Sequence, residues 1–325
     1  IRFPTKNMYT DSGLRIRKIK TRKDVLQIGE LIENCFHPYL DPDGRRFVEH
    51  LQQIGKEYRD HPFFSLFRSF DLLLKGFVSI NPQGKIDGVV TLFPCNVEYS
   101  FGYLIANVCV APESRHKGIA TALMAFALHY AEKHHADTVY LQVREETPEA
   151  VRLYRKLNFT EDARRTIWIR PKSDMQYPDE KVITFTEPNE QERTDFIHSF
   201  YKAYPEKILW NLNYVSDIFG MGALAKIKRH LRKLESQFYQ MQNADHQTIG
   251  WAAWQKTNSF TDTLWLVPTE ACTGEEMTAA LRKLGDLYAD KKAVSINFEK
   301  GRFTEAFEKA GFHKQGNSIW MSKKL

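Results

Sequence analysis

Asn107-Val-Cys-Val-Ala-Pro-Glu-Ser-Arg-His-Lys-Gly-Ile-Ala-Thr121 is the stretch of sequence that decides the fold. Its first residues are apolar, as in a buried strand, and an amphipathic helical pattern follows from Ile119. A short loop between them holds one glycine and three basic side chains. The stretch therefore predicts a strand, a tight loop and a helix, a unit typical of α/β folds.

The loop and the start of this helix predict an anion site. The N–H groups of a helix's first turn lack intrahelical partners, and the helix dipole favours negative charge there. Gly118 and the small Ala120 allow a phosphate to approach the backbone closely, and Arg115, His116 and Lys117 add positive charge. An ordinary loop with basic surface residues remains the alternative, because short glycine motifs are common and neither a Walker loop nor a three-glycine dinucleotide fingerprint is present.

Hydrophobic periodicity around this unit predicts an α/β sandwich with a mixed sheet in the first half of the chain. The expected strands are 14–19, 70–80, 86–93, 101–110, 138–143 and 165–170. The expected helices begin near residues 24, 46, 119 and 148.

The second half repeats the first. Tyr154–Phe159 precede an Ile-Trp pair at 167–168, and Phe307–Phe312 precede another at 319–320. Matches in the same order indicate two copies of one domain.

Length and composition agree with two globular domains. At roughly 100–200 residues per domain, a chain of 325 residues favours two. The polar, proline-containing stretch 172–180 is typical of a linker. We therefore expect a first domain at 1–171, a linker at 172–180 and a second domain at 181–325.

The composition also limits location and partners. Apolar residues make up 42% of the chain, and the net charge of +6 suits an anionic ligand without implying nucleic acid. No apolar run has transmembrane length, and the charged first thirty residues exclude a continuous signal-peptide core, so no membrane partner is expected. The four cysteines have no zinc spacing, which predicts no metal site, buried structural thiols and a reducing, cytoplasmic location.

The sequence resembles the GNAT superfamily of N-acetyltransferases. The family signature, Arg/Gln-x-x-Gly-x-Gly/Ala after Val-x-Val-x-Pro, is matched by Arg115–Ala120 after Val108–Pro112. A later family motif is matched by Ala150-Val-Arg-Leu-Tyr-Arg-Lys-Leu-Asn-Phe159. The resemblance covers about residues 14–170 and extends to 181–325 through the internal repeat.

The resemblance implies a fold and a site. It implies two GNAT-like domains of the α/β (α+β) class, each with a mixed, mostly antiparallel sheet flanked by helices. Acyl-CoA, by default acetyl-CoA as cosubstrate, would lie between the splayed parallel strands 101–110 and 138–143. The implied CoA-binding residues are Val108, Cys109, Val110, Arg115, His116, Lys117, Gly118, Ile119, Ala120, Thr121 and Thr147.

In this family the acceptor attacks the thioester directly. The backbone near Val110 would polarise the carbonyl, and Tyr154 occupies the position of the general acid that protonates the departing thiolate. A phenol suits this role because it holds its proton at neutral pH. Without the motif, Tyr154 would be interpreted as a core aromatic.

Three positions depart from the family pattern. Thr147 stands where Asn is common, and Gln142 and Leu104 stand where other members place a glutamate base. The residue that acts as the general base is therefore not identified. The candidates are Glu98, Glu145, Glu146, His37, Asp41 and Asp43. Residues 37–46 lie where the family builds its acceptor site, although a capped turn before a helix explains them equally.

The second half has lost the features of the cofactor site. Gly274 matches the loop glycine, but Glu275 and Glu276 follow it and would repel a pyrophosphate. Phe307 replaces Tyr154 and has no proton to give. The second copy is therefore expected to be degenerate, with a structural role or a role in the acceptor pocket. Its basic run at 226–233 predicts a solvated helix face, with an RNA, phosphate or membrane contact as the alternative.

The sequence thus predicts an acyl-CoA-dependent N-acyltransferase that acts on a primary amine of a small molecule or peptide. A non-catalytic acyl-CoA-binding or sensing protein and a FemX-like aminoacyltransferase are the alternatives. The acceptor, the acyl chain length and the oligomeric state stay open.

Overall fold

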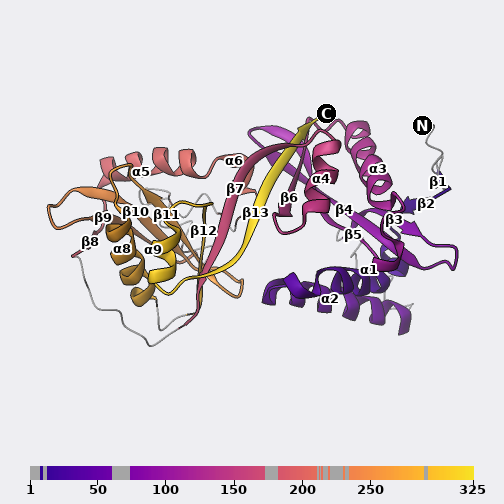
Figure 1. Cartoon of the computed structure of the whole chain (residues 1–325), viewed down its shortest axis with the longest axis horizontal. Coiled ribbons are helices and arrows are strands. Elements are labelled where there is room, and N and C mark those ends of the chain that lie inside the picture. Colours follow the sequence, from indigo (N-terminus) through magenta and orange to yellow (C-terminus); the bar gives the residue numbers. More distant parts are fainter. Residues whose placement is uncertain are drawn as a thin grey trace. The chain divides into compact units, whose positions relative to one another are not determined.

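The computed structural model describes residues 8–9, 13–60, 74–172, 182–210, 212, 214, 219, 230, 234–288 and 292–325 (Figure 1). They form two compact units whose segments alternate along the chain. The first unit comprises Ile1–Gln142, Arg152–Thr160 and Met321–Leu325, and the second comprises Val143–Val151 and Glu161–Trp320. Of the expected linker 172–180, only Lys172 is described. The division into 1–171 and 181–325 stays a prediction.

The first unit is built on the strand order β1-β2-β3-β4-β5-β6. Its strands are β1 (Met8–Tyr9), β2 (Arg15–Lys18), β3 (Lys75–Ile80), β4 (Ile86–Val97), β5 (Ser100–Val110) and β6 (Thr138–Arg144), the last running into the second unit. Its helices are α1 (Thr21–Phe36), η1 (His37–Tyr39), α2 (Pro42–Asp60), η3 (Pro112–Ser114), α3 (Ile119–Lys133) and α4 (Pro148–Lys156), which begins in the second unit. Pairing is antiparallel from β1 to β5 and parallel between β5 and β6.

Helices cover both faces of this sheet, with α1 and α2 on one face and α3 on the other (Figure 1). The apolar faces of α1 and α2 share one core with β3–β5, which includes Ile28, Val89 and Cys109. On the other face α3 approaches closely at Gly88, where an added Cβ would lie 2.8 Å from Ile119 Cγ2. This close packing fixes the start of α3 against the sheet.

The second unit has the strand order β7-β12-β11-β10-β9-β8. Its strands are β7 (Thr160–Arg170), β8 (Thr184–Thr186), β9 (Ser236–Gln242), β10 (Thr248–Gln255), β11 (Asp262–Pro268) and β12 (Val294–Glu299). Its helices are α5 (Glu190–Ala203), α6 (Glu206–Leu209), α8 (Gly274–Leu287) and α9 (Thr304–Lys309). Only β11 and β12 pair in parallel among these strands, so both units have the mixed, mostly antiparallel sheet that was expected.

The two units exchange their last strands. Strand β7 follows α4 in the first half of the sequence, but it pairs with β12 in the second unit. The final strand β13 (His313–Lys324) returns the chain to the first unit, where Ser322 O accepts a hydrogen bond from Thr160 Oγ1 and Leu325 N donates to Asp137 O. The expectation that 165–170 completes the first sheet is therefore wrong. Strand partners depend on the three-dimensional path of the chain, which local periodicity does not encode.

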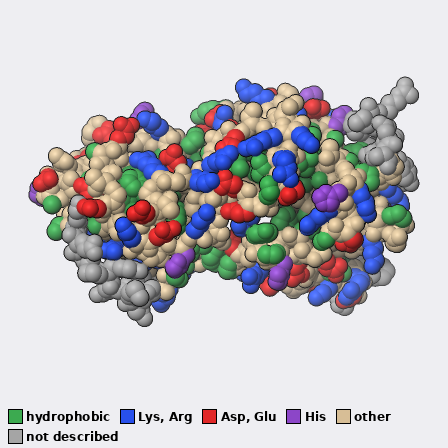
Figure 2. Space-filling model, viewed as in Figure 1, with side chains coloured by type: hydrophobic (Ala, Val, Ile, Leu, Met, Phe, Trp, Pro, Cys, Tyr) green, Lys and Arg blue, Asp and Glu red, His purple; other side chains and the backbone are tan. Residues whose placement is uncertain are grey.

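The surface carries charges of both signs. In the view of Figure 2, Lys and Arg side chains are interspersed with Asp and Glu. Apart from His230, the basic run at 226–233 lies outside the described residues. Within the described part of the chain, no helix has the length and apolar character needed to cross a membrane.

Candidate acyl-CoA site

Strand β5 contains a bulge in front of the predicted anion loop. Asn107 has φ 51°, and the β4–β5 register shifts between Val89 and Thr91. Thr91 Oγ1 donates to Ala106 O at 2.9 Å and accepts from Asn107 Nδ2 at 3.0 Å. These bonds hold an asparagine in a left-handed conformation that few other residues tolerate. Sequence reasoning missed Thr91 and Asn107, although an asparagine directly before the Val-x-Val strand is a signal for such a bulge.

Beyond the bulge, one edge of β5 is open, in that no strand among the described residues pairs with it. Its parallel register with β6 runs from Gly102–Thr138 to Ile105–Leu141 and ends there, although β5 continues to Val110. Ala111 N donates to Asp87 O on β4, so the alternation of an antiparallel ladder directs the N–H and C=O of Val110 away from β4. The open edge of β5 thus presents backbone groups that an extended amide-containing ligand could pair with, as an added strand does.

The loop after β5 ends at the uncapped start of α3. Gly118 is the N-cap of α3 with φ 78°, and the first helical bond after it runs from Ala122 N to Gly118 O. An added Cβ at Gly118 would meet nothing within 4 Å, so its conformation, rather than lack of space, requires glycine. The N–H groups of Ile119, Ala120 and Thr121 precede the helical ladder, which is the arrangement that binds phosphate.

The three basic side chains of the loop are exposed, and two of them bond to backbone carbonyls nearby. Arg115 Nε donates to Val110 O at 3.3 Å, and Lys117 Nζ donates to Glu113 O at 3.0 Å. His116 has φ 62°. The structure therefore places Arg115, His116 and Lys117 around the start of α3, and their role at a pyrophosphate site stays a prediction.

Tyr154 lies on the same unit as this loop. It is 6% exposed and packs edge-on against Phe159 with 5.9 Å between the ring centroids. Burial, with a smaller contribution from Cys109, raises the pKa of Tyr154 well above its usual value. The phenol is therefore protonated at neutral pH and lies within electrostatic range of β5.

The remaining candidates have other partners. Thr147 Oγ1 donates to Arg144 O at 2.7 Å, and both residues belong to the second unit. Glu145 Oε2 lies 2.6 Å from Lys300 Nζ, and this ion pair lowers the pKa of Glu145. Glu146 Oε1 accepts from Asn317 N at 3.1 Å. A carboxylate with a lowered pKa is a poorer base, so Glu145 is a weaker candidate than its position in the sequence indicates.

The stretch 37–46 forms the short helix η1 and the start of α2. Asp41 Oδ1 accepts from Gly44 N at 2.7 Å, and Asp43 is ion-paired with Arg46. His37 is exposed, and Glu98 lies at the tip of the β4–β5 hairpin with φ 51°. This is the capped turn before a helix that was the alternative interpretation. Leu104 and Gln142 lie on β5 and β6 and are both half-buried.

A cysteine pair lies at the open edge of β5, and sequence reasoning missed it. The expectation that all four thiols are buried holds for Cys109 and Cys272 but is wrong for Cys35 and Cys95, which are half-exposed. Cys35, in the last turn of α1, donates a hydrogen bond at 3.4 Å to the carbonyl oxygen of Val110, the residue that follows Cys109. Cys35 stays partly exposed because it lies in the last turn of α1, and no periodicity rule predicts this.

Among the described residues, the start of α8 in the second unit differs from the start of α3. Helix α8 begins with Thr273 as its N-cap, and Thr273 Oγ1 accepts from Glu276 N while Glu276 Oε2 accepts from Thr273 N. Gly274 is the first residue of α8 and lies outside the left-handed region, so it does not correspond to Gly118 in conformation. Strands β10 and β11 pair in continuous register, and Phe307 stacks on Trp168 at 4.9 Å.

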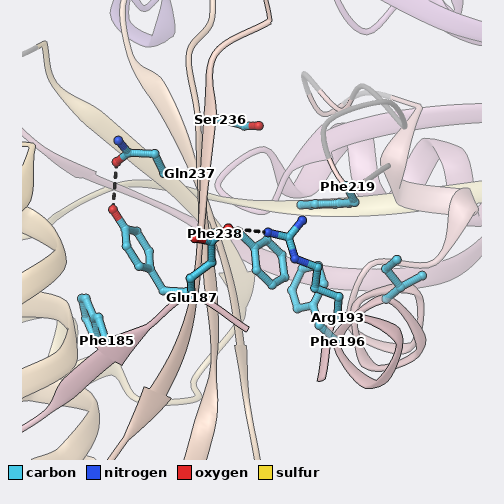
Figure 3. A pocket seen from close by; sticks show the side chains of 10 residues that line it. Phe185, Glu187, Arg193, Phe196, Phe219, Ser236, Gln237 and Phe238 are labelled. Atoms are coloured by element: carbon cyan, nitrogen blue, oxygen red, sulfur yellow. Dashed lines mark hydrogen bonds and ion pairs between the residues drawn. The ribbon is translucent and has the colours of Figure 1, made fainter. Parts of the chain in front are cut away.

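Two cavities lie in the second unit, and none of the predicted CoA-binding residues lines either of them. One, of about 370 Å³, lies beside β8, β9 and α5, and Arg193 and Glu187 form an ion pair of 3.0 Å at it (Figure 3). The other, of about 1030 Å³, lies between the start of α8 and α9 and has Glu275, Glu305, Arg282 and Lys309 in its wall. Among the described residues, no group of three or more His, Cys, Asp and Glu side chains could hold a metal ion.

Comparison with known proteins agrees with this geometry. The sequence model of the Acetyltransferase (GNAT) family matches residues 35–159. Over these residues the chain is similar to the GNAT family. The match contains the bulged strand, the Gly118 loop and Tyr154.

Solved structures resemble the whole chain and not just residues 35–159. A GCN5-related N-acetyltransferase from Sphaerobacter thermophilus is 14% identical with a TM-score of 0.57, and the match covers 98% of this chain and 97% of that one. A GCN5-related glucosamine N-acetyltransferase region of a fungal multi-domain GH3 β-N-acetylglucosaminidase is 14% identical with a TM-score of 0.54, covering 95% of this chain and 38% of that one.

A tandem GNAT protein from the clavulanic acid biosynthesis pathway is 13% identical with a TM-score of 0.47, and the match covers 96% of this chain and 98% of that one. At these identities the two matches above 0.5 establish the shared fold over both units. No curated protein sequence matches this chain.

Proposed function

We propose that the first unit is an acyl-CoA-dependent N-acyltransferase that transfers an acetyl group from acetyl-CoA to a primary amine of a small molecule or peptide. The observation that carries this proposal is the left-handed Gly118 at the uncapped start of α3, directly after the bulged and open-edged strand β5. The bulge, the open edge and the uncapped helix lie in sequence order, as an extended pantetheine with a pyrophosphate at its end requires.

Each part of the donor would meet a matching feature. The pyrophosphate oxygens would accept hydrogen bonds from the first-turn N–H groups of α3, with Arg115 and Lys117 balancing their charge. The amide groups of pantetheine would pair with Val108–Val110 along the open edge of β5. A backbone N–H of that edge would polarise the thioester carbonyl.

Tyr154 would act as the general acid. The acceptor nitrogen attacks the carbonyl carbon, the C–S bond breaks, and the phenol hydroxyl gives its proton to the departing thiolate. Burial keeps that proton in place until the thiolate forms, because the raised pKa of Tyr154 disfavours the phenolate. The amine must attack in its neutral form, and no residue is assigned to remove its proton.

The second unit would serve a structural role. The capping box of Thr273 and Glu276 uses the N–H groups that would otherwise bind phosphate. We therefore propose one acyl-CoA per chain. The four free cysteines fit the cytoplasmic location expected from the sequence.

An assay of thiol release from acetyl-CoA with a panel of primary amines tests this proposal. Polyamines, amino sugars, aminoglycosides and peptides with free N-termini should be included, and the acetylated product should be identified by mass spectrometry. We expect at least one amine to raise CoA release above hydrolysis in the wild type and not in Gly118→Glu. Binding of acetyl-CoA without acetylation of any amine would favour an acyl-CoA-sensing protein instead.

A further inference from the structure

Cys35 and Cys109 bring two thiols together from elements far apart in the sequence. Cys35 lies in the last turn of α1 and is half-exposed, whereas Cys109 lies on β5 and is 6% exposed. Both side chains pack in the core between α1, α2 and the sheet, and Cys35 Sγ lies 3.4 Å from the carbonyl oxygen of Val110, the residue that follows Cys109. We propose that this pair is a redox-reactive dithiol at the edge of the acyl-CoA site, which hydroperoxides oxidise to a Cys35–Cys109 disulfide.

The surroundings divide the two thiols into a reactive and a resolving partner. The groups that face Cys35 are the Cys109 thiol, the Arg115 guanidinium and, more weakly, the Glu113 carboxylate. Interaction with the Cys109 thiol, helped by Arg115, lowers the pKa of Cys35 to about 7, and burial opposes this effect. Interaction with Cys35, together with burial, raises the pKa of Cys109. Such a half-exposed thiol beside a cation is the type that reacts with oxidants.

The chemistry needs only a hydroperoxide as oxidant. The Cys35 thiolate attacks one peroxide oxygen, the O–O bond breaks, and Cys35 becomes a sulfenic acid while hydroxide leaves and takes up a proton. The Cys109 sulfur then attacks the Cys35 sulfur, the S–O bond breaks, and the Cys109 proton leaves with hydroxide as water. Two thiols are thereby oxidised by two electrons, and one peroxide is reduced to two waters.

Cys95 and Cys272 have raised pKa values, unlike Cys35, and serve as internal controls. Burial raises the pKa of Cys95 to about 11. Cys272 donates to the backbone carbonyl of Thr273 at 3.6 Å, and burial raises its pKa as well. Both thiols should therefore stay reduced under conditions that oxidise Cys35.

The cysteine pair lies beside the proposed acyl-CoA site. The expectation that acetyl-CoA protects the pair rests on the proposed function. Cys35 Sγ and Arg115 Nε both bond to Val110 O, which belongs to the open edge of β5. An acyl-CoA that pairs with this edge would displace the Cys35 thiol from Val110 O and cover it. Acetyl-CoA should then protect the dithiol from oxidation.

Oxidation of the reduced, full-length chain with hydrogen peroxide tests the dithiol itself. We expect the intact mass to fall by two hydrogen atoms and peptide mapping to join Cys35 to Cys109. In Cys109→Ser the disulfide should be absent and dimedone should trap a sulfenic acid at Cys35, whereas Cys95→Ser should behave as the wild type. Iodoacetamide should alkylate Cys35 with a rate that rises through about pH 7. A chain whose Cys35 and Cys109 stay reduced, or whose disulfide joins other cysteines, would overturn the proposal.

A second arm repeats the oxidation with acetyl-CoA, after calorimetry has shown whether it binds. At about ten times the Kd, about one chain in ten is unliganded, so the oxidation rate should fall about tenfold. An unchanged rate with bound acetyl-CoA would overturn the placement of the pair at the acyl-CoA site. If calorimetry shows no binding, the proposed function fails, while the first arm still decides whether the dithiol exists.

Discussion

Gly118 and Thr273 are the N-caps of the corresponding helices α3 and α8, and they leave the two helix starts in opposite states. Gly118 has φ 78° and no side chain, so the first-turn N–H groups of α3 face outward. Thr273 closes a capping box with Glu276, so those of α8 are partly bonded within the helix. This difference is the physical basis for assigning one acyl-CoA site to two similar units.

The first prediction concerns the loop glycine. Gly118→Glu forces a side chain and a negative charge to the start of α3, so acetyl-CoA should no longer raise the melting temperature. In the wild type, ligand at about 100 times its Kd should stabilise the fold by about 2.7 kcal/mol. Gly84→Glu is the matched control, because Gly84 has φ 81° with open space for a side chain and lies in a turn of the same unit. Equal ligand-induced shifts in both variants would show that CoA binds elsewhere.

The second prediction tests the bulge in β5. Thr91→Val keeps the side-chain shape but removes the hydroxyl that bonds Ala106 O and Asn107 Nδ2. Leaving these partly buried groups unpaired should cost about 1 kcal/mol of unfolding free energy and should also weaken acetyl-CoA binding. Thr166→Val, which removes the buried bond to Asn317 Oδ1 in the second unit, should destabilise the chain without affecting Kd. If Thr91→Val loses stability but keeps an unchanged Kd for acetyl-CoA, the bulge does not contribute to acetyl-CoA binding.

The third prediction concerns Tyr154. Tyr154→Phe keeps the ring but removes the proton, so kcat should fall by about 10²–10⁴-fold with little change in the Kd for acetyl-CoA. The raised pKa of Tyr154 adds a pH signature. An ordinary tyrosine loses its proton near pH 10 and would give an alkaline loss of activity there, whereas Tyr154 should remain protonated and kcat should not fall. A full kcat in Tyr154→Phe at saturating substrates would identify Tyr154 as a packing residue.

The fourth prediction concerns the second unit. Thr273→Ala removes the hydroxyl that accepts from Glu276 N, and loss of such a cap typically costs about 1 kcal/mol. Thr273→Ser should restore most of that stability in urea denaturation. Neither variant should change the Kd for acetyl-CoA. A change in Kd would show that the start of α8 takes part in binding.

Local patterns in the sequence predicted much of the first unit. Alternating apolar residues identified β2, β4 and β5, and the helical pattern after Gly118 identified α3, because in these elements burial of one face dominates the choice of structure. The signature Arg115–Ala120 likewise placed the anion loop, since its glycine is needed for a left-handed backbone. Of the expected strand 70–80, residues 70–73 lie outside the described part of the chain.

Features that depend on long-range packing were not predictable. The pairing of β7 with β12 joins strands more than a hundred residues apart, and no local signal distinguishes it from pairing within the first half. The contact between Glu145 and Lys300 and the hydrogen bond from Cys35 to Val110 O have the same origin. In each case, side chains of ordinary sequence context acquire a partner only when the chain has folded.

Calorimetric titration of the full chain with acetyl-CoA tests the central claim most directly. The account predicts a stoichiometry near one for the wild type, no binding for Gly118→Glu, and wild-type binding for the matched Gly84→Glu. A stoichiometry near two, or binding that survives in Gly118→Glu, would contradict the assignment of a single acyl-CoA site to the start of α3.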